Sequence, residues 1–106
     1  MNINITGKQL DIGQYLPEHV REKLENSIHK YFKDATQADV VFEKVNQGFE
    51  ASIRVHINKL IHINASGEGH DVYSAFNTAL EHACKRLRRK KRQIVSHSGV
   101  EKLVAV

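Results

Sequence analysis

The chain has 106 residues, of which 41% are hydrophobic, and a net charge of +4 at pH 7 with histidine neutral. This length suits one compact domain and leaves little room for a second. The single cysteine, Cys84, excludes a secreted scaffold held together by intrachain disulfides. The sequence has no signal-peptide pattern and no apolar run near the length of a membrane span, so we expect a soluble, cytoplasmic protein.

The N-terminal third predicts a strand followed by a helix. Polar and apolar residues alternate over 2–6, as in a half-buried strand. Over 14–32, apolar residues recur every three or four positions and indicate an amphipathic helix; they are Leu16, Val20, Leu24, Ile28, Tyr31 and Phe32. Gly13 is the expected N-cap, and Pro17 falls in the first turn, where its missing N–H leaves no hydrogen bond unmade.

Three strands are predicted next, over 38–45, 49–57 and 60–66. The middle strand alternates most cleanly, so one of its faces should be buried, and antiparallel hairpins should join the three. The segment 66–69 has the composition of a turn that closes the sheet. The open face of this sheet would present Arg54, His56 and His62.

A long helix is predicted over 71–94, with Asp71 at its N-cap. Its apolar stripe comprises Val72, Phe76, Leu80, Ala83, Leu87 and Ile94. Residues 96–106 are expected to form a short tail, which leaves 1–95 as the single domain. The order is β-α-β-β-β-α, and both helices should cover the apolar face of the sheet. The predicted fold class is therefore α+β, a two-layer sandwich with a four-stranded sheet.

The stretch most informative about function is 85–92, in which seven of eight residues are cationic: Lys85, Arg86, Arg88, Arg89, Lys90, Lys91 and Arg92. The exception, Leu87, falls on the apolar stripe, so the stretch should be a docked helix and not a free basic arm. With only two acids, Asp71 and Glu81, the 71–94 helix carries +5, more than the whole chain.

Such dense positive charge favours a nucleic-acid interface. Cations at helical spacing repel one another, and phosphates would relieve that repulsion while releasing counterions. The alternative interpretation is a solvated helix end that promotes solubility. On the first helix, Arg21 and Lys23 alternate with glutamates, where ordinary i,i+4 ion pairing is the stronger interpretation. On the open sheet face, the basic side chains could contact RNA or simply face solvent.

The sequence contains no recognisable catalytic or metal-binding pattern. His56 and His62 could meet across a hairpin, but two ligands do not make a typical zinc site. The chain has no phosphate-binding glycine loop, and Cys84 beside the apolar stripe resembles a small buried hydrophobe. We therefore expect no enzyme activity, no cofactor, no metal ion and no small-molecule substrate.

Several segments, taken in order, resemble one protein family. They are Ile3-Asn-Ile-Thr-Gly7, Lys30-Tyr31-Phe32, Glu68-Gly-His-Asp71-Val-Tyr73-Ser-Ala75-Phe76 and the basic helix. Together they are similar to the ribosome hibernation promoting factor and ribosome-associated inhibitor family, also called sigma-54 modulation proteins. The resemblance covers roughly residues 2–94 without a large gap.

This resemblance implies a ribosome-binding function. It implies a fold similar to double-stranded-RNA-binding domains and a site on the small ribosomal subunit near the decoding centre, where the protein blocks the paths of mRNA and tRNA. The rRNA contacts carry over onto Lys85, Arg89 and Lys91, and the other four cations of 85–92 extend them. Arg21 and Lys23 carry over from the first helix.

The chain departs from the family pattern in its last helix and in its length. His82 stands where the family often has lysine, and it would join the basic patch if a nearby phosphate favoured its protonated form. Asn77 replaces a frequent acidic residue. Long members have a second domain that dimerises ribosomes. A short member would need a separate ribosome modulation factor to do so, or would keep ribosomes as inactive monomers.

Two other functions remain open at this point. The first is a general double-stranded-RNA-binding module that lays the 71–94 helix against phosphates. The second is a homodimeric protein-interaction domain, formed through the open sheet face and the apolar end Val104-Ala105-Val106.

Overall fold

In the computed structural model the chain forms one sheet and two helices, in the order β1 (Asn2–Lys8), α1 (Tyr15–Tyr31), β2 (Gln37–Val45), β3 (Gly48–His56), β4 (His62–Gly69) and α2 (Val72–Ala105). The structure describes the backbone of residues 1–105 and the side chains of residues 1–95. The expected α+β class and the β-α-β-β-β-α order are confirmed.

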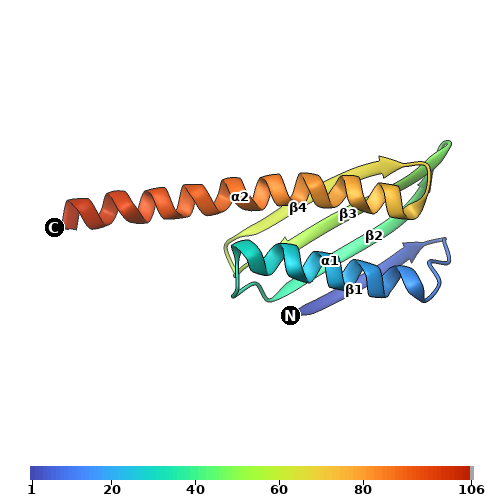
Figure 1. The fold of residues 1–106 in the computed structure, drawn as a ribbon, viewed down its shortest axis with the longest axis horizontal. Coiled ribbons are helices and arrows are strands. Elements are labelled where there is room, and N and C mark those ends of the chain that lie inside the picture. The colour runs from blue at the N-terminus through green and yellow to red at the C-terminus, as the bar shows by residue number, and fades with distance from the viewer. Residues whose placement is uncertain (106) are drawn as a thin grey trace.

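The four strands lie in sequence order across the sheet. β1 pairs with β2 in parallel, because α1 carries the chain back between them, and the later pairs are antiparallel hairpins. Figure 1 shows both helices on one face of the sheet, side by side and running toward the same end. The two-layer arrangement is therefore the expected one, and the other face of the sheet is open.

A single hydrophobic core fills the space between the helices and the sheet. The predicted stripe of α1 is confirmed, since Leu16, Val20, Leu24 and Ile28 are all buried. Phe42 of β2 meets Phe76 of α2, with ring centroids 6.4 Å apart. Burial of about twenty apolar side chains in this layer supplies most of the free energy that orders the domain.

The last strand differs from its predicted bounds for a physical reason. β4 begins at His62 and continues through the segment expected to be a turn, ending at Gly69. Gly67 and Gly69 face α2, where a Cβ added to Gly67 would lie 2.4 Å from the Ala79 nitrogen. These glycines therefore allow close contact between strand and helix, and their turn-like composition reflects packing and not a turn.

The helix termini also depart from the prediction. Asp71 caps α2 as expected, accepting a hydrogen bond from the Ser74 N–H at 2.8 Å. Gly13 is not the N-cap of α1; that position is Gln14, and Gly13 adopts φ +68° in the preceding turn. α2 continues to Ala105, through residues expected to form a tail, and Figure 1 shows it projecting past the sheet. The side chains of 96–106 lie outside the described residues.

The open face of the sheet carries polar residues in rows across the strands. One row places Glu43, Glu50 and Glu68 directly opposite one another on β2, β3 and β4. Another row places Asp39, Arg54 and Asn64 together. We call the first set the glutamate row. It lies on the opposite side of the sheet from the two helices.

Candidate nucleic-acid interface

The basic stretch of α2 is held in place by the core. Leu87 is completely buried, so the cations on either side of it belong to a helix that is docked on the sheet. All seven cationic side chains keep contact with solvent, and Lys90 is the least exposed of them. The prediction of a docked basic helix is thereby confirmed.

The seven cations do not form one flat patch. Each residue turns the helix by about 100°, so the seven cations point in several directions around the helix, while Leu87 points into the core. Lys85, Arg88, Arg89 and Arg92 are all exposed and lie about 100° or more from Leu87 around the helix, and we call these four residues the crest. Hollows on the two flanks of the helix are lined by the other three cations and by some members of the crest.

On one flank, α2 forms a furrow with α1. Tyr31 of α1 and Cys84, Lys85 and Arg88 of α2 line a hollow of about 420 Å³. His19 of α1 packs edge-on against Tyr73 of α2, with centroids 5.3 Å apart. Lys23 is exposed one turn after His19, so helical spacing places it on the same side of α1 as His19.

Arg21 does not share this position. It stands two residues before Lys23, about 200° around the helix, and is exposed on a different side. The two predicted residues of α1 are therefore not brought together. Among the side chains that the structure describes, the ion pairs expected along α1 do not form.

The other flank of α2 follows the edge strand β4. Arg86, Arg89 and Lys90 share a hollow with His62 and Asn64. Arg86 also reaches the open face of the sheet, where it lines a second hollow with Arg54. Sequence reasoning missed that Arg54 and Arg86 line one hollow, because this depends on where α2 lies relative to the edge of the sheet.

His82 has a structural partner. Its Nδ1 lies 2.7 Å from the Ser66 carbonyl oxygen on β4. Since a carbonyl only accepts, Nδ1 carries the proton and Nε2 remains available to a ligand. His82 therefore helps cover the edge of the sheet. The prediction that it adds to the basic patch is a separate role, which its free Nε2 leaves possible.

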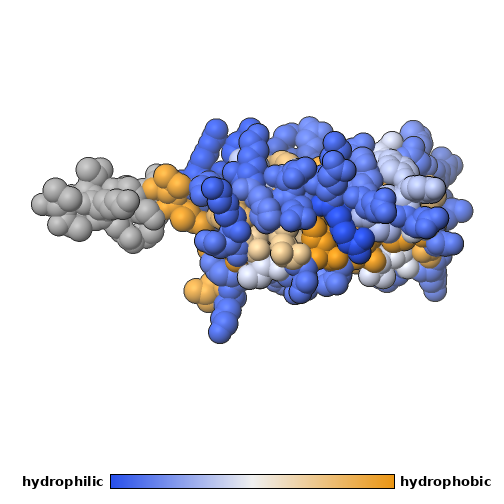
Figure 2. Space-filling view, turned by 60° about the horizontal axis from the view of Figure 1, so that its bottom comes forward, coloured by the Kyte–Doolittle hydropathy of each residue, from blue (hydrophilic) through white to orange (hydrophobic). Residues whose placement is uncertain are grey.

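Most of the positive charge on α2 is uncompensated. Lys85 lies 3.7 Å from Glu81, and no other member of the 85–92 stretch pairs with a carboxylate among the described side chains. Lys91 lies over the Phe32 ring, 5.5 Å from its centroid, which leaves its charge without an anion. Figure 2 shows the long hydrophilic side chains that project from this part of the molecule. The surface is complementary to a polyanion.

Comparison with known proteins identifies the family. The model of the sigma 54 modulation protein / S30EA ribosomal protein family matches residues 3–95.

The chain belongs to this family.

Relatives in the S30EA family include two named ribosome hibernation factors. The chain is 32% identical to the ribosome hibernation promotion factor of Rhizobium meliloti, over 92% of this chain and 51% of that protein. It is also 32% identical to the ribosome hibernation promoting factor of Salmonella typhimurium, over 92% of this chain and the whole of that one. The chain thus spans about half the length of the first relative.

A solved structure shares the fold. The N-terminal domain of Protein Y from Thermus thermophilus superposes with a TM-score of 0.72 at 25% identity, covering 84% of this chain and 98% of that one. The expected resemblance to the hibernation factor family is thereby confirmed at the level of both sequence and fold.

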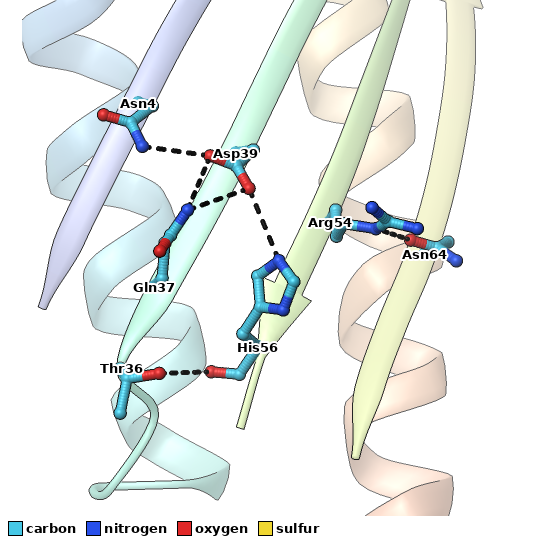
Figure 3. A network of polar contacts seen from close by, with 7 residues as sticks. All are labelled: Asn4, Thr36, Gln37, Asp39, Arg54, His56 and Asn64. Carbon is cyan, nitrogen blue, oxygen red and sulfur yellow. Dashed lines mark hydrogen bonds and ion pairs between the residues drawn. The ribbon is translucent and has the colours of Figure 1, made fainter. Parts of the chain in front are cut away.

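The open sheet face of this S30EA domain carries a second polar cluster, centred on Asp39. Figure 3 shows Asn4 and Gln37 directed toward its carboxylate, which accepts their hydrogen bonds at 3.0 and 3.1 Å. His56 lies 3.5 Å from the same carboxylate. Burial by itself would raise the pKa of Asp39, but these partners outweigh it and hold the pKa below its ordinary value of 3.8.

The predicted meeting of His56 with His62 is confirmed, since they are cross-strand partners with ring centroids 6.2 Å apart. Within the part of the chain whose side chains are described, no three His, Cys, Asp or Glu residues are grouped to hold a metal ion. Over the described residues, neither helix has a stretch that is both long enough and apolar enough to cross a bilayer.

Proposed function

We propose that this domain is a ribosome hibernation factor, which binds rRNA of the small ribosomal subunit and holds the ribosome inactive without chemistry of its own. The observation that carries the proposal is the cationic crest of α2, of which only Lys85 pairs with a carboxylate among the described side chains, on a helix docked against the core. Membership of the S30EA family and two relatives named as hibernation factors support it.

The proposed contacts are electrostatic. The crest and Arg86, Lys90 and Lys91 face phosphates, Lys23 adds a cation from α1, and His82 offers Nε2. Arg21 is a peripheral contact in this proposal, because it lies on a different side of α1. Phosphate contacts of this kind position a protein on RNA without reading its sequence.

The proposed consequence is steric. A domain seated near the decoding centre occupies the space of mRNA and tRNA, so translation cannot start in its presence. The domain acts in the cytoplasm, where its ribosome partner is found. Whether bound ribosomes dimerise depends, in this proposal, on a separate ribosome modulation factor.

The first test removes charge from the crest. In the Arg89→Gln, Arg92→Gln variant, we expect affinity for purified small subunits to fall at least tenfold near 100 mM salt. The slope of log affinity against log salt should become shallower by about 1.5, since each phosphate contact contributes roughly 0.7–0.9. Glutamine keeps the helix propensity of arginine, so the fold should survive.

The matched control is Lys8→Gln, Lys44→Gln, which removes the same charge from exposed positions away from α2. If both variants lose affinity equally, net charge and not the crest carries binding, and the site assignment is wrong. Failure of the unmodified protein to sediment with small subunits at low salt would overturn the proposed function itself.

Sucrose gradients with and without a modulation factor separate the two modes of hibernation. A dimer peak that needs both proteins indicates a promoting factor, and binding without such a peak indicates a monosome inhibitor. Equal affinity for arbitrary RNA duplexes and for small subunits would instead favour a general double-stranded-RNA-binding module.

A further inference from the structure

A second basic surface lies at the end of the sheet from which α2 projects. A groove of about 1190 Å³ runs between the end of α1, the β3–β4 turn and the underside of α2. Its lining includes Lys30 and Lys33 from α1 and the loop after it, Lys59 from the turn, and Lys91 from α2. Asp34 is the one acid in that lining. We call this surface the end groove.

The floor of the end groove is apolar and aromatic. Ile57, Ile61 and Ile94 line it, together with Tyr31. Tyr31 is partly exposed, and the Lys30 ammonium lies 5.7 Å from the centroid of its ring. Figure 2 shows hydrophobic surface beside hydrophilic side chains at this end of the molecule. A lysine rim over an apolar floor fits a ligand that presents both anionic and flat apolar groups.

The walls of the groove are already ordered. The loop after α1 is joined to β3 by the Thr36 N–H, which donates to the His56 carbonyl at 3.0 Å. The β3–β4 turn is closed by the Asn58 side-chain oxygen, which accepts from the N–H groups of Leu60 and Ile61 at 2.8 and 2.9 Å. A ligand would therefore meet a preformed site and lose little affinity to ordering it.

We propose that the end groove holds a single-stranded segment of RNA, with phosphates on the lysine rim and a base against Tyr31 and the isoleucines. The inference rests on the proposed function for the presence of RNA, but it concerns a site separate from the crest. Lys91 belongs to both the basic stretch and the groove, so a strand leaving α2 can enter the groove without crossing neutral surface.

A single strand fits the groove better than a duplex or an acidic peptide. Bases in a duplex are stacked inside the helix, so a duplex would use the lysine rim and leave the apolar floor empty. A peptide carboxylate would satisfy the rim, but the rim is continuous with a surface that suits phosphates. Only unpaired nucleotides supply a chain of phosphates and exposed ring faces together.

The test compares three variants on two probes by fluorescence anisotropy. The probes are a twelve-nucleotide uridylate strand and an abasic phosphodiester strand of the same length. For Lys30→Gln, Lys33→Gln, Lys59→Gln we expect at least tenfold weaker binding of the uridylate strand. For Tyr31→Leu we expect about fivefold weaker binding of uridylate and little change with the abasic strand, because the lost contact is with a base. Lys8→Gln, Lys44→Gln is the charge control, and its change in log affinity is compared with that of the triple variant per charge removed.

The outcomes separate this inference from the proposed function. Unchanged uridylate affinity in the triple lysine variant overturns the end groove as an RNA site. Equal losses on both probes in Tyr31→Leu overturn base contact, and a thermal melt of that variant shows whether its fold is intact. If the unmodified protein binds uridylate through the groove but never sediments with ribosomes, the proposed function fails and the groove stands.

Discussion

At the scale of single residues, Asp39 is the clearest case of a side chain whose chemistry is set by its neighbours. Two amide groups and an imidazole point at one carboxylate on the open face of the sheet. Because folding lowers the pKa of Asp39, the native state favours its ionised form. The resulting stability is present above the ordinary value of 3.8 and is lost as the pH falls through the native value.

We predict that Asp39→Asn weakens the acid sensitivity of the fold. Between pH 6 and pH 2.5, the free energy of unfolding should fall less in the variant than in the unmodified protein, because the variant has no carboxylate to protonate there. Urea unfolding at the two pH values measures this difference. Asp34→Asn, in the exposed loop before β2, is the control that removes a carboxylate outside the cluster. Identical pH dependence in the unmodified protein and Asp39→Asn would contradict the prediction.

The sequence predicts the cations of the candidate interface but not the elements beside which they lie. Leu87 was enough to predict that 85–92 is a docked helix, since one apolar residue among seven cations must face the core. The surroundings of the cations depend on tertiary distances: Lys91 lies over the Phe32 ring of another element, and Arg86 lines one hollow with Arg54. The Asp39 cluster was missed for a similar reason, because only the strand register brings Asn4 and His56 to Asp39.

At the scale of elements, the backbones of β4 and α2 approach each other very closely. We call this contact the β4–α2 joint. Gly67 and Gly69 of β4 lie under Ala75 and Ala79 of α2, so backbone meets backbone with almost no side chain between them. This joint fixes the height of α2 above the sheet. It therefore also fixes how far Arg86 and His82 can reach over the edge of β4.

We predict that Gly67→Ala destabilises the domain by about 1–3 kcal/mol, the usual cost of overpacking a core. The added methyl would lie 2.4 Å from the Ala79 nitrogen, so α2 has to move. Urea unfolding measures the loss, and Ser66→Ala, on the exposed side of the same strand, should stay within about 0.5 kcal/mol of the unmodified protein. A neutral Gly67→Ala would mean that the joint is looser than the structure indicates.

Large apolar residues that recur with a clear period predict the elements correctly. The small inward residues at the end of β4 do not. The strands and α1 were found from their apolar periodicity, which large residues make visible. Gly67 and Gly69 continue the inward side of β4, following Ile63 and Ala65 at steps of two, but glycine also marks turns. The matching signal was Ala75, Ala79 and Ala83 at steps of four, a small-residue face that fits a glycine strand.

At the scale of the whole molecule, the cations of the crest and the carboxylates of the glutamate row lie on opposite faces of the sheet. The crest of α2 faces away from the sheet, while the glutamate row occupies the open face. Like charges directly opposite one another in a sheet are unfavourable, so Glu43, Glu50 and Glu68 cost some stability, which Lys8 opposite Glu43 on β1 partly offsets. We infer that the glutamate row makes the open face unsuitable for RNA at that end.

We predict that Glu43→Gln, Glu50→Gln, Glu68→Gln raises the affinity for random RNA duplexes more than the affinity for small subunits. The variant has a net charge three units higher and no repulsive face, so non-specific contacts increase. Binding to both partners at one salt concentration gives the specificity ratio. A ratio that stays constant would show that the glutamate row plays no part in discrimination.

In the proposed function, the glutamate row also affects how the protein approaches RNA. The cations of 85–92 lie beside the start of β4 and the glutamate row lies near its end on the other face, so the molecule has a permanent electric moment directed from the glutamate row toward the basic part of α2. In the field of a polyanion, such a body is rotated before contact, so it arrives with α2 leading. Collisions in the wrong orientation become rarer. The protein therefore begins to adopt its binding orientation during diffusion, before the two surfaces are in contact.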